Sequence, residues 1–241
     1  MKSQNRRVAV IVSIAGALAL GGCAASTDAQ HTPASTQSEE PPVLTQTGPT
    51  ESGTQPVQTP SAIEVEATPS YMVYGDPNAK TTIDIYSDYL CPHCAQYASD
   101  VLPELKSDAL AGSDIKVVLH DFRVIDDSGS MLTAVAARAA GEQGKFDEMH
   151  AVLMQEQQSL HDHLSADTLD EEVMVELAKQ AGVPDLQKFE SDINNVALSR
   201  GVVEDERQGE QMNVDGTPAV FVNGERVKQP TLNEIRKLTR G

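Results

Sequence analysis

Two cysteines, Cys91 and Cys94, have the spacing of a disulfide-exchange pair. They lie where a β-branched and aromatic segment, residues 81–86, gives way to helix formers, residues 95–102. Pro92 suits the first turn of that helix, because its missing N–H leaves no hydrogen bond unmade there. Unpaired N–H groups and the dipole at a helix N-terminus favour a thiolate. We therefore expect Cys91 to be an exposed nucleophile and Cys94, one turn further on, to be the buried resolving thiol.

The same spacing is compatible with two other uses. A CxxC pair is half of a zinc site, but the chain has no second such pair, so histidines would have to complete the site; the candidates are His120, His150, His161 and His163. A purely structural disulfide would close a loop of only two residues and stabilise the fold weakly. We interpret the pair as a redox-active centre that needs no metal and no other cofactor.

Two further segments accompany the cysteine motif. The Gly-Asp-Pro turn at residues 75–77 comes first, with a strand and the Cys-Pro-His-Cys motif after it; residues 139–150 and residues 216–224 follow. In this order, the three motifs resemble the DsbA-like branch of the thioredoxin superfamily. The first is similar to the first half of that family, the second to its inserted helical region, and the third to its cis-proline loop and the strand that follows. The likeness covers roughly residues 70–240.

The resemblance implies an α/β thioredoxin fold with an all-helical insertion, at about residues 128–211, between the CxxC half and the cis-proline half. It also implies that Thr217–Pro218 is a cis peptide facing the cysteines, with the Thr217 backbone free to pair with a substrate chain; from sequence alone, a trans proline is the default. His93 is expected to tune the pair, since an imidazole beside a sulfur favours the thiolate. The alternative for His93 is an ordinary solvated residue.

One position departs from this family. Many relatives carry a buried acid six residues before the first cysteine, and that position is Ile85 here. Asp84 is expected to point to the other face of its strand, because side chains alternate along a strand. The sequence therefore names no proton acceptor for Cys94.

Residues 1–22 are typical of a lipoprotein signal peptide. A short basic segment without acids precedes an apolar run, residues 8–20, which is shorter than a membrane span. The run ends at Gly21-Gly22-Cys23, which resembles a bacterial lipobox, so Cys23 is expected to carry lipid and anchor the chain to the membrane. An uncleaved apolar anchor is the alternative. Cys91 and Cys94 then remain as a pair in an extracytoplasmic compartment, where disulfides persist.

The next segment, residues 23–68, is predicted to be a disordered tether, because it is rich in Ser, Thr, Pro, Gln and Glu and nearly free of aromatic residues. Residues 69–241 are enough for one domain with a proper core. The formal charge is −18, and loss of the three cations in the signal peptide makes it −21. Such an acidic chain argues against nucleic acid as a partner and disfavours adhesion to an anionic bilayer.

Hydrophobic periodicity and turn residues give the remaining elements. Strands are expected at residues 71–74 and 115–120, two helices between 130 and 158, further helices from 168, at 186–195 and at 197–211, a hairpin over Asn223-Gly224, and a helix at 232–238.

Three clusters are interpreted as structural. We place His161-Asp162-His163 in a solvated loop between helices and not in a metal site. Met149 and Met154 are expected in the core and not in a copper site. Residues 126–129 are expected to form a turn and not a calcium loop.

These features predict a lipid-anchored, extracytoplasmic thiol–disulfide oxidoreductase that introduces disulfides into exported proteins. Its partners would be exported proteins that contain cysteine and a membrane redox protein that re-oxidises the Cys91–Cys94 pair. A reductase or isomerase fed by a membrane electron donor is one alternative. A surface lipoprotein that binds peptide or metal without catalysis is the other.

Overall fold

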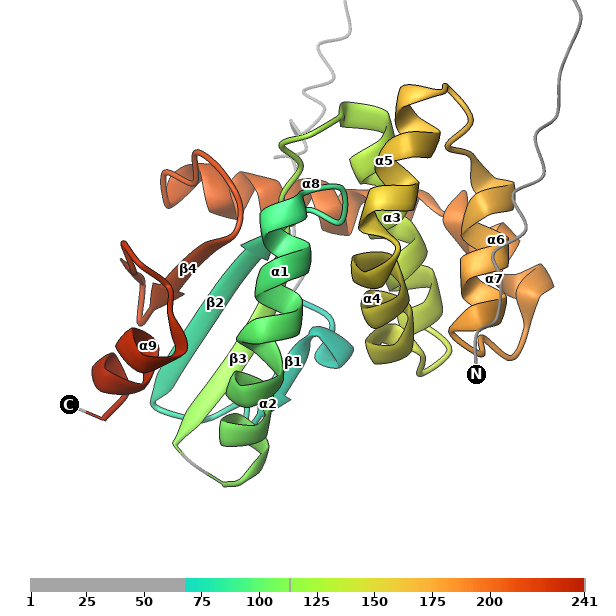
Figure 1. The fold of residues 1–241 in the computed structure, drawn as a ribbon. Helices are drawn as coiled ribbons and strands as arrows, with labels where there is room; N and C mark the ends of the chain where they lie inside the picture. The colour runs from blue at the N-terminus through green and yellow to red at the C-terminus, as the bar shows by residue number, and fades with distance from the viewer. Residues whose placement is uncertain (1–67, 113, 241) are drawn as a thin grey trace, which may run out of the picture. The chain divides into compact units, whose positions relative to one another are not determined.

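The computed structural model describes residues 68–112 and 114–240 (Figure 1). The expected signal peptide, the expected lipidation site Cys23 and the tether up to residue 67 lie outside the described residues. Within the described part of the chain, no helix combines the length and the apolar character that are needed to cross a membrane.

A five-stranded mixed sheet, in the order β1-β3-β2-β4-β5, forms the centre of the described part. Its strands are β1 (Val73–Gly75), β2 (Thr81–Ser87), β3 (Ile115–Asp121), β4 (Ala219–Val222) and β5 (Glu225–Arg226). β2 and β3 are parallel, and the other pairings are antiparallel. Because β2 is hydrogen-bonded on both sides, the cysteine-bearing segment that follows it starts from a well-fixed backbone.

The β4–β5 hairpin forms as the Asn-Gly pair predicts. Asn223 and Gly224 have φ angles of 51° and 82°, the left-handed conformation that a two-residue type I′ turn requires. The Asn223 side chain also accepts a hydrogen bond from the backbone N–H of Thr82 at 2.9 Å. The turn is thus attached to the start of β2.

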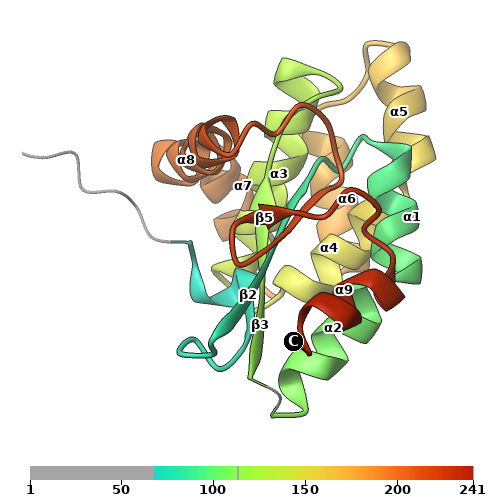
Figure 2. The same ribbon diagram turned by 90° about the vertical axis from the view of Figure 1, so that its left-hand side faces the viewer.

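Helices cover both faces of the sheet (Figure 2). α1 (Pro92–Asp100), α2 (Leu102–Leu110) and α9 (Leu232–Leu238) lie on one face, and α8 (Val196–Gln211) crosses the other. α8 comes close to the sheet because Gly209 has no side chain; a Cβ atom there would lie 2.6 Å from the Phe122 ring.

Helices α3 to α8 separate β3 from β4 in the sequence, and they include α3 (Asp127–Gly141), α4 (Phe146–Gln155), α5 (Gln157–Ser165), α6 (Glu171–Gln180) and α7 (Leu186–Ile193). α3 is their centre and contacts α4, α6, α7 and α8. Its buried face consists largely of alanine, whose small side chain lets neighbouring helices approach closely. The predicted fold class, an α/β thioredoxin fold with an all-helical insertion, is confirmed.

The region around the first helix differs from the sequence prediction in two places. Residues 70–72 form a 3₁₀ turn ahead of β1, so the first strand is shorter than expected. α2 was not predicted at all. The chain leaves α1 at Val101 and resumes as a helix at Leu102, and Pro103 in its first turn lacks the N–H that would have continued α1.

Two predictions for the insertion are wrong in detail. Three helices, not two, begin between residues 127 and 158, and His161 and His163 lie in α5 and not in a loop. Residues 126–129 form a helix start and not a simple turn: the Asp126 carboxylate accepts hydrogen bonds from the backbone N–H groups of Ser128 and Gly129 and so caps α3. Met149 and Met154 are buried in the core, as predicted.

A network of buried charged side chains joins the sheet to the insertion. Arg138 of α3 donates hydrogen bonds to Asp121 of β3 at 2.7 Å and to Asp205 of α8 at 2.5 Å. His120 lies between Asp205, at 3.4 Å, and Asp84, at 3.0 Å. Asp84 therefore faces α8, away from the cysteines, as strand alternation predicted.

The position of His120 gives the fold a defined pH dependence. Burial alone would lower the pKa of His120, but its hydrogen bonds to Asp205 and Asp84 outweigh burial and raise the pKa to about 9. A raised histidine pKa contributes stability that is complete below about pH 6.5 and is lost as the pH rises through the folded-state pKa. We expect the free energy of unfolding to fall by about 3 kcal/mol between about pH 6 and pH 9.

Urea denaturation of the oxidised protein measures this effect without the titration of free thiols. His120→Gln is the control, because glutamine bonds to carboxylates but does not titrate in this range, and its stability should change little over the same interval. An equal fall in stability in the variant would assign the pH dependence to another group.

Candidate active site

The CxxC motif occupies the junction between β2 and α1. Cys91 is the N-cap residue of α1 and has an extended backbone, with φ −86° and ψ 119°. Pro92 is the first residue of the helix, as predicted. The Cys91 carbonyl accepts a hydrogen bond from the backbone N–H of Cys94 at 3.0 Å and thereby closes the first turn. The conformational preferences of neighbouring residues are therefore enough to place both sulfurs at the N-terminal end of α1.

Cys91 is less accessible than the sequence predicted, with 4% of its surface exposed. Its Sγ lies 3.5 Å from the carbonyl oxygen of Thr217, and the Thr217–Pro218 peptide is cis. The loop that carries this peptide covers the sulfur, so the expectation of an exposed Cys91 is wrong. The structure brings Cys91, Cys94 and Thr217 together at one site, although Thr217 lies 126 positions from Cys91 in the chain.

The Cys91 sulfur is in an environment that favours the thiolate. A hydrogen bond from the Cys94 thiol is the largest favourable influence; burial opposes it, and Thr217 and the backbone N–H groups of Cys94 and His93 add to it. Together they lower the pKa of Cys91 to about 5. At neutral pH the cysteine is thus a thiolate, the form that attacks disulfides.

Cys94 has the opposite character. The hydrogen bond that it donates to Cys91, together with burial, raises the pKa of Cys94 well above its usual range. Its side chain is 1% exposed, and its Sγ lies 3.5 Å from the backbone N–H of Asp88. A buried thiol that keeps its proton can attack Cys91 only after a nearby group removes that proton.

His93 lies in the first turn of α1 with its imidazole exposed to solvent. Its backbone N–H belongs to the set that lowers the pKa of Cys91. The contribution of the imidazole itself stays a prediction.

Asp88 is a site residue that the sequence analysis missed. It is 3% exposed, and its carboxylate accepts hydrogen bonds from the backbone N–H groups of Leu90, Val124 and Ile125 and from the hydroxyl of Ser130, at 2.8–3.1 Å. Asp88 thus ties the cysteine loop to the segment between β3 and α3. An acid three residues before a CxxC motif was the only available signal, and the sequence does not show what it bonds to.

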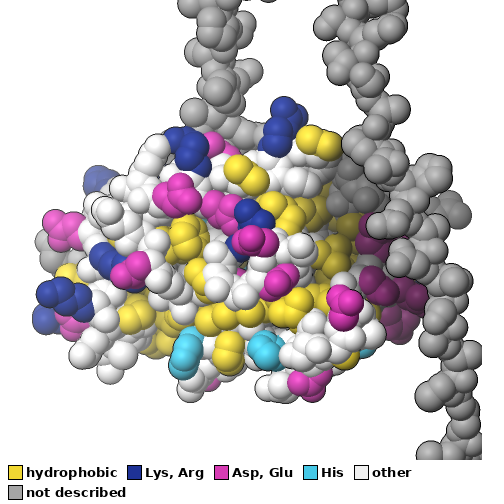
Figure 3. Space-filling view, turned by 90° about the horizontal axis from the view of Figure 1, so that it is seen from above, with side chains coloured by type: hydrophobic (Ala, Val, Ile, Leu, Met, Phe, Trp, Pro, Cys, Tyr) yellow, Lys and Arg dark blue, Asp and Glu magenta, His cyan; other side chains and the backbone are white. Residues whose placement is uncertain are grey.

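Figure 3 shows the side of the molecule on which the N-terminal end of α1 lies. Hydrophobic side chains form a band across this face, with acidic and basic side chains scattered around it. Val124 and Ile125, in the segment held by Asp88, are 41% and 40% exposed. Exposed apolar surface of this kind suits contact with another polypeptide that exposes apolar side chains of its own.

A thiolate at a helix start, a buried partner thiol and a facing cis-proline define a dithiol protein with a thioredoxin-like site. The chain belongs to the thioredoxin family, which matches residues 67–239. Structural similarity shows that the chain also shares its fold with a solved DsbA protein. α-DsbA1 of Wolbachia pipientis is 15% identical, with a TM-score of 0.60, and the match covers 70% of this chain and 88% of that one.

Two further proteins have names that refer to disulfide chemistry. MdbA of Corynebacterium diphtheriae, described as a thiol-disulfide oxidoreductase, has the same fold at 24% identity and a TM-score of 0.58, covering 68% of this chain and 87% of that one. A Rickettsia prowazekii protein whose name assigns it as a protein-disulfide oxidoreductase is 24% identical over 167 residues, 69% of this chain. The match spans 59% of the length of that relative.

Proposed function

We propose that the protein is an enzyme that exchanges disulfides with polypeptides through Cys91 and Cys94, and that it works in the oxidising direction. The observation that carries the proposal is the lowered pKa of Cys91, about 5, at a sulfur 3.5 Å from the cis-proline loop. The names of the relatives support disulfide chemistry in general. The direction is argued from the thiolate itself.

A stable Cys91 thiolate lowers the free energy of the reduced form relative to the disulfide form. With a pKa of about 5, the thiolate is stabilised by about 3 kcal/mol at neutral pH. That energy corresponds to a reduction potential about 60 mV more oxidising than it would be with a pKa of about 7. A protein whose reduced form is stabilised tends to transfer its disulfide to other thiols. We therefore infer that this protein donates disulfides to exported proteins and is re-oxidised by a membrane redox partner.

The reduction potential tests the direction. We expect a value above about −180 mV in equilibrium with glutathione; a value near about −270 mV, as in thioredoxin, would instead make the protein a reductase. His93→Ala removes the imidazole and keeps the backbone N–H, whereas His93→Pro removes both. Both variants should have a lower, more reducing, reduction potential than the wild-type protein, by about 30 mV for each unit by which the pKa of Cys91 rises. An unchanged potential in His93→Ala would exclude the imidazole from the mechanism.

We propose further that lipid on Cys23 anchors the protein outside the cytoplasm. The support is the lipobox-like sequence, and Cys23 lies outside the described residues. Cys23→Ser should move the protein from the membrane fraction to the soluble fraction and leave disulfide exchange intact, since Cys91 and Cys94 are untouched. A variant that stays in the membrane fraction would identify the apolar segment at residues 8–20 as an uncleaved anchor.

A further inference from the structure

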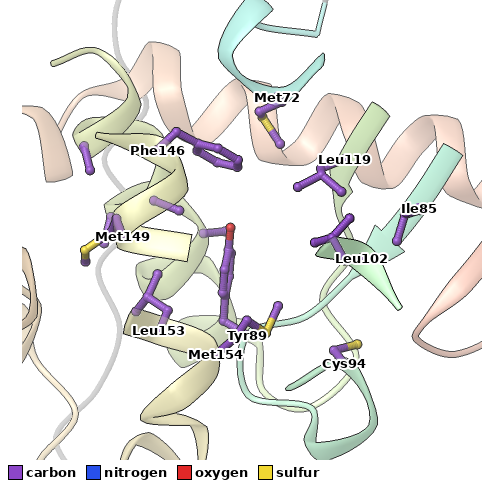
Figure 4. Packing of buried hydrophobic residues seen from close by; sticks show 14 of the residues in the cluster. Met72, Ile85, Tyr89, Cys94, Leu102, Leu119, Phe146, Met149, Leu153 and Met154 are labelled. Atoms are coloured by element: carbon purple, nitrogen blue, oxygen red, sulfur yellow. The ribbon is translucent and has the colours of Figure 1, made fainter. Parts of the chain in front are cut away.

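A small cavity lies beside the buried thiol Cys94. It has a volume of about 20 Å³, enough for one water molecule. Its walls come from α1, from β2 and β3, and from α4, and they include Cys94, Tyr97, Ile85, Asp121 and His150. Figure 4 shows Cys94, Ile85, Leu119, Leu102 and Met72 around the same interior space, with the Tyr89 ring along one side.

Two polar groups in this cavity point to a bound water. The Tyr97 hydroxyl is buried and has no hydrogen-bond partner among the described residues, and buried hydroxyls are nearly always hydrogen-bonded to protein or to ordered water. Asp121, also in the cavity wall, is buried and can accept hydrogen bonds. A water between these groups would satisfy the hydroxyl and lie against the wall that contains Cys94.

We propose that a water molecule in this cavity connects the Cys94 thiol to the Asp121 carboxylate, and that Asp121 takes the Cys94 proton when the disulfide closes and returns it when the disulfide opens. In closure, Cys94 loses its proton to Asp121 through the water. The Cys94 thiolate then attacks the Cys91 sulfur of a mixed disulfide. The Cys91–Cys94 bond forms, and the partner leaves as a thiolate with the electron pair.

The two histidines in the cavity wall, His120 and His150, are less suited to this task. His120 is held between Asp84 and Asp205 through both ring nitrogens. Burial lowers the pKa of His150 to about 4, which makes it a weak base. Ile85, in the strand next to Asp121, carries no titratable group at all. Asp121 is the acid that combines a place in the cavity wall with burial.

The surroundings of Asp121 suit a proton acceptor at neutral pH. Burial raises the pKa of Asp121, the Arg138 guanidinium lowers it, and Asp205 raises it. Together these influences bring the pKa of Asp121 to about 6. Charged or titratable groups face it from every element packed around it: Arg138 of α3, Asp205 of α8, His120 of β3, His150 of α4, Cys94 and Tyr97 of α1, Tyr71 and Tyr89. Above about pH 6 the carboxylate is therefore free to take a proton.

The test isolates the Cys94 step in a Cys23→Ser background. The reduced protein is labelled on Cys91 with the thionitrobenzoate group of Ellman's reagent, and release of the coloured thiolate by Cys94 is followed by stopped flow across the pH range. The inference rests on the exchange chemistry proposed above. If the label never leaves the wild-type protein, that chemistry fails. If the label leaves but the release rate is the same in the wild-type protein and in Asp121→Asn, only the present inference fails.

In the wild-type protein, the release rate should rise up to about pH 6 and then level off, as expected for a base with the pKa of Asp121. Asp121→Asn should release the label at least about tenfold more slowly at neutral pH, because general base catalysis is typically worth 10²- to 10⁴-fold. Its rate should climb about tenfold per pH unit without levelling off, since hydroxide must then remove the proton.

Asp205→Asn is the matched control. It also removes one carboxylate from Arg138, but Asp205 does not line the cavity. Because Asp205 raises the pKa of Asp121, the plateau of this variant should begin at a lower pH, and its rate should fall far less than that of Asp121→Asn. Equal slowing in both variants, or a plateau retained in Asp121→Asn, would overturn the proposal. So would an equal loss of the plateau in His150→Gln.

Asp121→Asn also weakens a buried ion pair and can fail to fold. Tyr97→Phe then decides, because it removes only the hydroxyl that would hold the water. The proposal requires a wild-type plateau above about pH 6 and a release rate several-fold lower in Tyr97→Phe. A wild-type rate that climbs steadily with pH, or a Tyr97→Phe rate equal to wild type, contradicts it.

Discussion

Cys94→Ser is expected to convert the protein into a covalent trap for its disulfide substrates. The Cys91 thiolate attacks a disulfide and forms a mixed disulfide, and the serine hydroxyl that replaces the Cys94 thiol cannot release it. Serine can still donate a hydrogen bond to Cys91, so the thiolate that starts the reaction should survive. We therefore expect turnover to disappear while the adduct accumulates in proportion to the protein.

Oxidised glutathione and mass spectrometry measure this outcome directly. In a Cys23→Ser background, the Cys94→Ser variant should retain a single glutathione, whereas the chain with both active-site thiols should finish as a glutathione-free disulfide. Cys91→Ser is the matched control and should form little adduct, because the thiol of Cys94 keeps its proton. A preference for the adduct at Cys94 would reverse the roles assigned to the two thiols.

The elements that the sequence predicted well are those with local causes. β2 is β-branched, the β4–β5 turn is an Asn-Gly pair, and α9 follows a Thr231 N-cap whose hydroxyl accepts a hydrogen bond from the backbone N–H of Glu234. The pattern of the CxxC segment likewise predicts a helix start. In each case, the residues that determine the conformation lie within a few positions of one another.

The features that the sequence did not predict depend on contacts between distant segments. Cys91 is covered by Thr217, and no local pattern shows that burial. In the sequence, Asp121 is only a polar residue at the end of a strand. Its buried ion pair with Arg138, 17 positions further along, is visible only in the structure. The α2 helix starts at a break that proline imposes, and its amphipathic pattern is short. The fold class was therefore predictable from motifs, whereas the proton acceptor proposed for Cys94 required the structure.

Asp88→Ala is expected to be the most destabilising single change in the loop that positions the cysteines. It would leave three backbone N–H groups and the Ser130 hydroxyl without their acceptor. An unsatisfied buried donor costs about 1–3 kcal/mol. Water reaches part of the exposed segment at residues 124–125 and reduces the loss there. We expect the free energy of unfolding to fall by about 3 kcal/mol or more.

Urea denaturation of the oxidised protein measures this loss, and Asp170→Ala is the matched control. Asp170 is an exposed N-cap residue whose carboxylate accepts one hydrogen bond, from the backbone N–H of Val173 at 3.1 Å, so its replacement should cost about 1 kcal/mol. Asp88→Asn should lie between the two, because its amide can keep the bond from Leu90 but turns an NH₂ group toward the donors of Val124 and Ile125. If Asp88→Ala costs no more than Asp170→Ala, the Asp88 carboxylate does not hold the cysteine loop in place.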